Sequence, residues 1–320
     1  MNLSRIPVPG VLMAAIVLLT SCPGGETSSL KPKGYESENI LTVETGDLKG
    51  VFVDNTEIKP DHRPGYNGIA QLYHKRQDSG IFVPAFAGFN LEHIFGGDSL
   101  HQVFEPRRHP MTLYRKTENA VMLHQSPTPL SRVESLTTFE MVAPHYVDIT
   151  FSCLLHSKDF FQHDYAGFFW ASYIQSPPDR KIYFLGVAEN ETTSPSWIGA
   201  WSEVHGVAST HRSLGDDHDF FFDDNLSPRL ASHFSSYRYT EPYFFGRYGD
   251  MVLAFMFDSR EVIRFSQSPT GGGGLNPAWD FQYLIPSPQE GKRYSFKARI
   301  IYKPFISEND VVEEYKTWRR

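Results

Sequence analysis

The chain has 320 residues, with 30 Lys and Arg against 37 Asp and Glu, and its net charge is −7. Hydrophobic residues make up 40% and charged residues 21%, a globular balance that excludes wholesale disorder. A general nucleic-acid binder needs clustered Lys and Arg to neutralise phosphates, so the acidic balance predicts no nucleic-acid partner. Aromatic residues reach 14%, and such side chains favour strands and also stack on flat ligands.

The first 21 residues have the pattern of a signal peptide. Arg5 supplies the positive start, and the apolar stretch from Val8 to Leu19 is too short for a comfortable membrane span. The stretch ends in Leu19-Thr20-Ser21-Cys22, which resembles the lipobox of bacterial lipoproteins. The resemblance implies cleavage before Cys22, a lipid on its sulfur as the only membrane contact, and a place in the bacterial cell envelope at the outer membrane. The alternative is an ordinary secretory signal with a chance Cys.

Residues 22–39 are rich in Gly, Ser, Lys and Glu, with few apolar side chains. Such a segment buries too little to offset its ordering entropy, so we expect a flexible tether that carries Cys22. A single domain is then expected over residues 40–320. The second cysteine, Cys153, shares the apolar parity of Val147, Ile149 and Phe151 and is expected to be a buried structural thiol.

Alternation of apolar and polar residues dominates the rest of the chain. Residues 294–303 and 147–153 alternate almost perfectly, as strands with one wet face do. Further predicted strands are 50–53, 68–73, 111–115, 120–124, 133–141, 168–174, 182–187, 251–257, 262–266 and 281–284. Many short strands separated by Pro and Gly turns predict an all-β fold, a large antiparallel sandwich.

One helix is predicted, at the C-terminus. Ser307 is a suitable N-cap, and Val311, Val312, Tyr315 and Trp318 form one apolar face. We expect this short helix to cover a sheet edge.

Familiar nucleotide-binding, serine-hydrolase and zinc-protease motifs are absent from the sequence. The glycine run 271–274 lacks the Lys of a phosphate loop and is expected to be a mobile loop at one end of the sandwich.

Candidate chemistry begins at Glu92 and His93, a carboxylate beside an imidazole. Neighbouring strand residues face opposite ways, so these two could share a site only in a loop or a bulge. An ordinary buried or surface pair is the alternative. Arg107 and Arg108 add two guanidinium groups suited to carboxylate or sulfate, unless they form a solvated charge run.

Two further segments carry acids near aromatic rings. Asp148, close to His145, lies on the polar parity of its strand, towards solvent or a ligand groove. Trp279 and Asp280 follow Asn276 and the glycine run, and an exposed Trp beside an acid suits a sugar, stacking on its C–H face. A core Trp and a turn Asp are the alternative.

The stretch from Asp216 to Asn225 is acidic. Calcium prefers oxygen ligands, and this stretch supplies five carboxylates but not the EF-hand spacing. A calcium site is therefore the weaker expectation, below an acidic loop with an aromatic plug, and no other metal or cofactor is expected. The five carboxylates are Asp216, Asp217, Asp219, Asp223 and Asp224.

Several segments together resemble the galactose-mutarotase-like β-supersandwich family. They are Tyr66-Asn67-Gly68 through Glu92-His93, Val133-Glu134-Ser135, Pro144-His145-Tyr146-Val147-Asp148 and Asn276-Pro277-Ala278-Trp279-Asp280-Phe281. The resemblance is one of layout over most of residues 40–303, and it assigns no role residue by residue. It implies a domain that handles carbohydrate, because the family includes aldose epimerases and modules of glycoside hydrolases and polysaccharide lyases.

The sequence therefore predicts a lipid-anchored envelope protein that acts on oligo- or polysaccharide. As a glycan-processing enzyme of hydrolase, lyase or epimerase type, it would use carboxylate and His acid–base chemistry, with Arg residues holding an anionic sugar group. The catalytic candidates are Glu92, His93, Glu134, His145, Asp148 and Asp280, and the substrate-binding candidates are Trp279, Arg107, Arg108 and Asn276. The alternatives are a non-catalytic glycan-binding lipoprotein that uses Trp279, Trp197 and Trp201 as stacking platforms, and a structural envelope protein.

Overall fold

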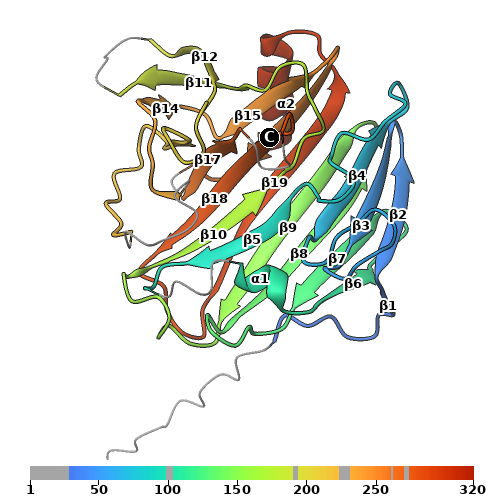
Figure 1. The fold of residues 1–320 in the computed structure, drawn as a ribbon, viewed down its shortest axis with the longest axis vertical. Coiled ribbons are helices and arrows are strands. Elements are labelled where there is room, and N and C mark those ends of the chain that lie inside the picture. Colours follow the sequence, from blue (N-terminus) through green and yellow to red (C-terminus); the bar gives the residue numbers. More distant parts are fainter. Residues whose placement is uncertain (1–28, 99–103, 190–193, 223–230, 261, 270–273) are drawn as a thin grey trace, which may run out of the picture.

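The computed structural model describes residues 29–98, 104–189, 194–222, 231–260, 262–269 and 274–320. Its strands pair antiparallel in three sheets, and the two helices are short (Figure 1). The predicted all-β antiparallel sandwich with a short C-terminal helix is confirmed. The lipobox Cys22 and the glycines 271–273 lie outside the described residues.

The largest sheet has eleven strands, in the order β1-β6-β7-β8-β9-β19-β16-β15-β11-β12, with β14 pairing to β11. Their bounds are β1 Ser37–Glu38, β6 Met111–Arg115, β7 Ala120–Gln125, β8 Val133–Val142, β9 Tyr146–Leu155, β11 Ile182–Ala188, β12 Ser196–Ala200, β14 Tyr237–Tyr239, β15 Tyr243–Tyr248, β16 Met251–Phe257 and β19 Arg293–Pro304.

Two smaller sheets pair as β13-β17-β18-β10-β5 and β2-β3-β4. Their strands are β2 Ile40–Thr45, β3 Leu48–Val53, β4 Gly68–His74, β5 Asn90–Phe95, β10 Tyr165–Ala171, β13 Thr210–His211, β17 Ile263–Ser268 and β18 Ala278–Pro286. The helices are α1 Glu105–Arg108 and α2 Glu308–Arg319.

The core lies between the large sheet and the two smaller sheets. The stacked rings of Trp170 and Phe281 come from the five-stranded sheet, with centroids 5.0 Å apart. Phe151 of β9 contacts Trp170 edge-on at 4.8 Å, and Phe52 of β3 contacts Phe139 of β8 at 5.3 Å. Each such fully buried ring contributes about 1.5–3 kcal/mol, so this aromatic layer holds the three sheets together.

The outer face of the large sheet is partly covered by α2. Ser307 caps this helix as predicted, accepting a hydrogen bond from the backbone N–H of Asp310 at 3.2 Å. Val311 is buried, and Val312, Tyr315 and Trp318 pack with it against the sheet. The predicted apolar face of the helix is therefore confirmed, but it covers a sheet face rather than an edge.

Residues 29 and 30, within the range expected to be a tether, contact the domain. The Ser29 hydroxyl donates to Glu134 Oε1 at 2.5 Å, the backbone N–H of Leu30 donates to the same oxygen at 3.0 Å, and the Leu30 side chain is buried. Cys153 is free and buried, and burial raises the pKa of its thiol, in agreement with a structural role. Within the described residues no helix is both long and apolar enough to cross a bilayer.

Candidate functional site

A β-bulge in β5 brings Glu92 to the face that carries His93. The pairing of β10 with β5 shifts register here, because Phe169 pairs with His93 whereas Trp170 pairs with Leu91. Glu92 is thus the extra residue of the bulge, and a bulged residue escapes the strict alternation of a strand. The Glu92 carboxylate lies 3.9 Å from Nε2 of His93. Glu92 and His93 therefore share a site, because the segment contains the bulge that such an arrangement requires.

The Glu92 carboxylate is held by two donors from other elements. Nη1 of Arg107, on α1, donates to Oε1 at 2.6 Å. The hydroxyl of Tyr173, two residues beyond the end of β10, lies 2.8 Å from Oε1 and 2.9 Å from Oε2. Charge-assisted bonds of this length are strong and fix the carboxylate in one orientation. Of the predicted residues, the structure therefore joins Glu92, His93 and Arg107.

Burial sets the protonation of this carboxyl group. Only 5% of Glu92 is exposed, and this burial raises its pKa above the ordinary value, although Arg107 and Tyr173 offset part of the rise. Burial also acts on Arg107, but the facing Glu92 outweighs it and holds the pKa of the guanidinium above its usual range. Arg107 is therefore always charged, whereas burial favours the protonated form of Glu92 more than it is favoured in an exposed carboxyl group.

Aromatic rings surround the Glu92–Arg107 pair. The Arg107 guanidinium carbon lies 3.9 Å from the ring centroid of Tyr66 and 4.9 Å from that of Phe104. Tyr66 in turn contacts Phe86 and Tyr173. Arg107 also lines an open depression of about 420 Å³, together with Pro64, Gly65, Phe104 and Arg108. A ligand in this depression meets the cations of Arg107 and Arg108 and the ring of Phe104, and Arg107 in turn contacts the buried carboxyl group of Glu92.

Asp280, on β18, is a second buried acid of the same region. Its Oδ1 accepts a hydrogen bond from the backbone N–H of Ser172 at 3.1 Å, and only 1% of the residue is exposed. Burial, and then the negative charge of Glu92, raise the pKa of Asp280 well above its usual range. Burial therefore favours the protonated form of Asp280, and the residue lies within β18 rather than in a turn.

Trp279 is also buried, which corrects the expectation of an exposed stacking ring. Its exposed fraction is 0%, because it alternates with Asp280 along β18 and faces the core, where its ring lies over Gly246. Its indole N–H donates to the backbone oxygen of Arg180 at 3.1 Å. Asn276 accepts hydrogen bonds from the backbone N–H and hydroxyl of Ser176 and so fixes a loop before β18.

Glu134 forms a separate cluster on the opposite side of the sandwich. Val133 and Phe139 of β8 face the core, so Glu134 faces outward on the large sheet. Besides Ser29, it contacts Nε2 of His124 at 2.8 Å and Nε2 of His156 at 2.9 Å. This cluster anchors the N-terminal segment and does not share partners with Glu92 among the described contacts.

Asp148 and His145 lie apart from Glu92 as well. Asp148 forms a two-bond ion pair with Arg299 of β19 at 2.6 and 2.7 Å, on the outer face under α2. His145 lies in the turn between β8 and β9, with Nδ1 3.8 Å from Asp47 and Nε2 3.6 Å from Glu314 of α2. These contacts tie α2 and the β2–β3 turn to the large sheet.

The contacts of Glu314 make the docking of α2 depend on pH. The nearby His145 ring, together with hydrogen bonds from Lys303 and Tyr146, outweighs burial and lowers the pKa of Glu314 to about 2. A depressed folded-state pKa contributes stability that is present above the unfolded value of 4.5 and lost as the pH falls towards 2. We expect the thermal midpoint of Glu314→Gln to lie below that of the wild type at about pH 7 and the gap to close near pH 2. A gap that stays constant over this range would contradict the assignment.

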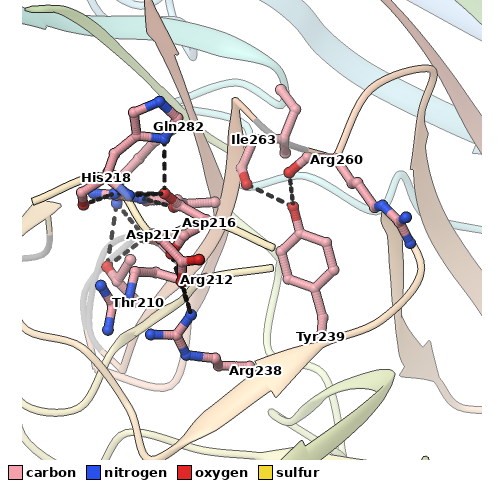
Figure 2. Close-up of polar contacts among 12 residues, drawn as sticks. Thr210, Arg212, Asp216, Asp217, His218, Arg238, Tyr239, Arg260, Ile263 and Gln282 are labelled. Atoms are coloured by element: carbon pink, nitrogen blue, oxygen red, sulfur yellow. Dashed lines mark hydrogen bonds and ion pairs between the residues drawn. The ribbon is translucent and has the colours of Figure 1, made fainter. Parts of the chain in front are cut away.

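The acidic stretch begins with a buried ion pair. Arg264 of β17 donates to Asp216 through Nε at 2.6 Å and Nη2 at 3.3 Å, and its exposed fraction is 0%. Figure 2 shows Asp216 among its polar neighbours, with Arg238 approaching from the side of Asp217. A carboxylate neutralised by a guanidinium has little charge left for a cation.

Only part of the expected calcium site lies among the residues that the structure describes. Asp223 and Asp224 lie outside the described residues, and Phe220 and Phe222 pack on Tyr165 at 4.7 and 5.5 Å, as a plug would. Among the residues that the structure does describe, no three His, Cys, Asp or Glu side chains gather closely enough to hold a metal ion.

Sequence reasoning missed the aromatic part of the site. Tyr66, Phe86, Phe104 and Tyr173 come from four separate segments, and only folding brings them together. His205 was missed as well; it is exposed, and its charge acts on Glu92. The one available signal was the abundance of aromatic residues around positions 66–104, which indicates a ring-lined region but not its partners.

Comparison with known proteins gives likeness of fold only. No protein-family model and no curated protein sequence matches the chain. The solved structure of a GalM/aldose epimerase homologue from C. elegans is similar at 9% identity, with 85% of this chain and 100% of that chain covered and a TM-score of 0.48. The heparan sulfate lyase HepC from Pedobacter heparinus is similar at 9% identity over 87% of this chain and 38% of that chain, with a TM-score of 0.42. Both TM-scores lie below 0.5, and the matches assign no reaction.

Proposed function

We propose that the protein is a glycan-processing enzyme in which Glu92 transfers a proton to or from a bound sugar. The observation that carries the proposal is the set of contacts at Glu92: a carboxyl group with a raised pKa, oriented by Tyr173 and by Arg107, which also lines a depression beside Phe104. Acid–base catalysis needs a group whose pKa lies near the working pH and whose position is fixed. Hydrolases, lyases and epimerases all use such a group.

The charge around the depression favours an acidic sugar as substrate. Arg107 and the exposed Arg108 line it, and Arg63 lies with its guanidinium carbon 5.4 Å from the ring centroid of Phe86. Guanidinium groups match carboxylate and sulfate geometry, and the aromatic rings offer surfaces for sugar C–H faces. Asp280 supports the proposal as a second buried acid, whose pKa is raised by burial and then by the negative charge of Glu92.

The proposal includes the cellular setting that the N-terminal sequence predicts: attachment through lipid on Cys22 in the bacterial envelope, at the outer membrane. Ser29, which lies seven residues after Cys22, and Leu30 donate hydrogen bonds to Glu134. Seven extended residues span at most about 25 Å, so such an anchor would keep the Glu134 end of the sandwich close to the bilayer.

The test is a panel of neutral, uronate-containing and sulfated oligosaccharides, followed for binding by calorimetry and for product formation by chromatography. We expect acidic members to bind and to be converted. Binding without conversion would indicate the non-catalytic glycan-binding alternative. A panel that shows neither binding nor conversion would contradict both.

A further inference from the structure

A second depression lies on the outer face of the large sheet, beside the start of α2. It has a volume of about 370 Å³ and is lined by side chains of β11, β15 and the connection from β19 to α2. Glu92 belongs to the five-stranded sheet, so the second depression is built on a different layer. The lining residues are Tyr183, Phe245, Arg247, Phe305, Ile306, Ser307 and Glu308.

Aromatic rings form the floor and walls of this depression. Phe245, only 1% exposed, is the floor; it stacks on Tyr183 with centroids 5.3 Å apart and lies 5.9 Å from Phe305. Trp197 contacts Phe245 from another side at 5.5 Å. Ile306 is 72% exposed at the rim. An open apolar surface of this kind on a folded domain is a candidate for ligand contact.

Arg247 brings a positive charge to the depression, and no ion pair among the described residues neutralises it. Its guanidinium carbon lies 4.3 Å from the ring centroid of Phe305. Its Nε is buried without a hydrogen-bond partner, and none of the ion pairs among the described residues includes Arg247. A buried donor without an acceptor is unfavourable, so an acceptor supplied by a ligand would be favoured at this guanidinium group. Glu308, which also lines the depression, offers a carboxylate for hydroxyl groups.

We propose that this depression is a secondary binding site for one acidic residue of a glycan chain, a uronate or a sulfated sugar. The C–H face of the ring contacts Phe305 and Tyr183, the anionic group accepts from Arg247, and a hydroxyl donates to Glu308. The class of ligand rests on the proposed function, because it is the glycan class favoured at Glu92. Binding of the polymer at this secondary site raises its effective concentration at the depression beside Glu92.

The experiment measures retention of an acidic and a neutral polysaccharide by the full chain in affinity electrophoresis, with turnover of a short substrate recorded in parallel. For Arg247→Gln we expect about tenfold weaker binding of the acidic polymer, the loss of one charge-assisted hydrogen bond, with unchanged kcat/KM on the short substrate. Arg238→Gln is the matched control: Arg238 pairs with Glu189 at 3.1 Å, and its loss should leave polymer binding as in the wild type.

Phe305→Leu removes the stacking face without touching charge and should weaken the same binding; it also tests the site if Arg247→Gln lowers the thermal midpoint. Unchanged acidic-polymer binding in both variants, or equal retention of neutral polymer, would overturn the proposal. If Arg247→Gln loses retention of the acidic polymer but the wild type shows no turnover, the second binding site is supported and catalysis at Glu92 is rejected.

Discussion

Replacing Glu92 by Gln is expected to lower turnover by about 10²–10⁴-fold, the range typical of a lost acid–base group. Gln keeps the size of the side chain and can still accept the hydrogen bond of Tyr173, but it cannot carry the proton. Substrate binding should change much less than kcat, because Arg107 and the surrounding rings remain in place. Initial rates on an acidic oligosaccharide, with folded protein quantified by thermal unfolding, give the measurement.

Glu134→Gln is the matched control for this variant. Glu134 is another buried carboxylate with close partners, but it lies on the outer face of the large sheet with His124 and His156. We expect turnover within a few-fold of the wild type, together with a lowered thermal midpoint. Equal losses of turnover in the two variants would indicate a general structural effect and refute the specific role of Glu92.

The largest loss of stability is expected for Asp216→Asn, at about 3–5 kcal/mol. The substitution removes the charge that faces Arg264, and the guanidinium then remains in a site with 0% exposure. Its neighbours, the rings of Phe220 and Phe234, stabilise a cation only partly. Chemical denaturation followed by tryptophan fluorescence measures the change in the free energy of unfolding.

Asp148→Asn provides the comparison, since it breaks an ion pair of similar geometry that is partly open to solvent. The side chains of Arg299 and Asp148 are 14% and 33% exposed. Water screens such a pair, so the expected loss is about 1 kcal/mol or less. If the free energy of unfolding falls no more in Asp216→Asn than in Asp148→Asn, other groups must stabilise the buried guanidinium of Arg264.

Strands were predictable where apolar and polar residues alternate, and also where a short run is apolar throughout, as in β16, whose seven residues are all buried. The structure places β6 and β16 at the predicted residues 111–115 and 251–257, and the alternation of residues 147–153 and 294–303 falls within β9 and β19. By contrast, β5 was not predicted as a strand, because the adjacent polar residues Glu92 and His93 interrupt the alternation at its bulge. Its bulge, which positions Glu92, is set by pairing with β10 about 75 residues along the chain.

The candidate site was predictable only in part, for a similar reason. Glu92, His93 and Arg107 are found by residue type, but the hydrogen bond from Tyr173 spans 81 residues and leaves no local pattern. Trp279 was predicted to bind the ligand because an acid and several glycines lie near it in the sequence. Its position in β18 instead directs its side chain into the core. Local composition does not specify which face of a strand is covered.

The pH dependence of kcat/KM in the wild type and in Tyr173→Phe tests the role of Glu92 most directly. Burial places the pKa of Glu92 above 4.5, and the hydroxyl of Tyr173 lowers it through its hydrogen bond. Removing this hydroxyl should therefore move the limb of the profile that Glu92 controls to higher pH. The acidic limb will move if Glu92 is the base, and the alkaline limb if it is the acid. A profile whose limbs both stay in place while the rate falls would contradict proton transfer by Glu92.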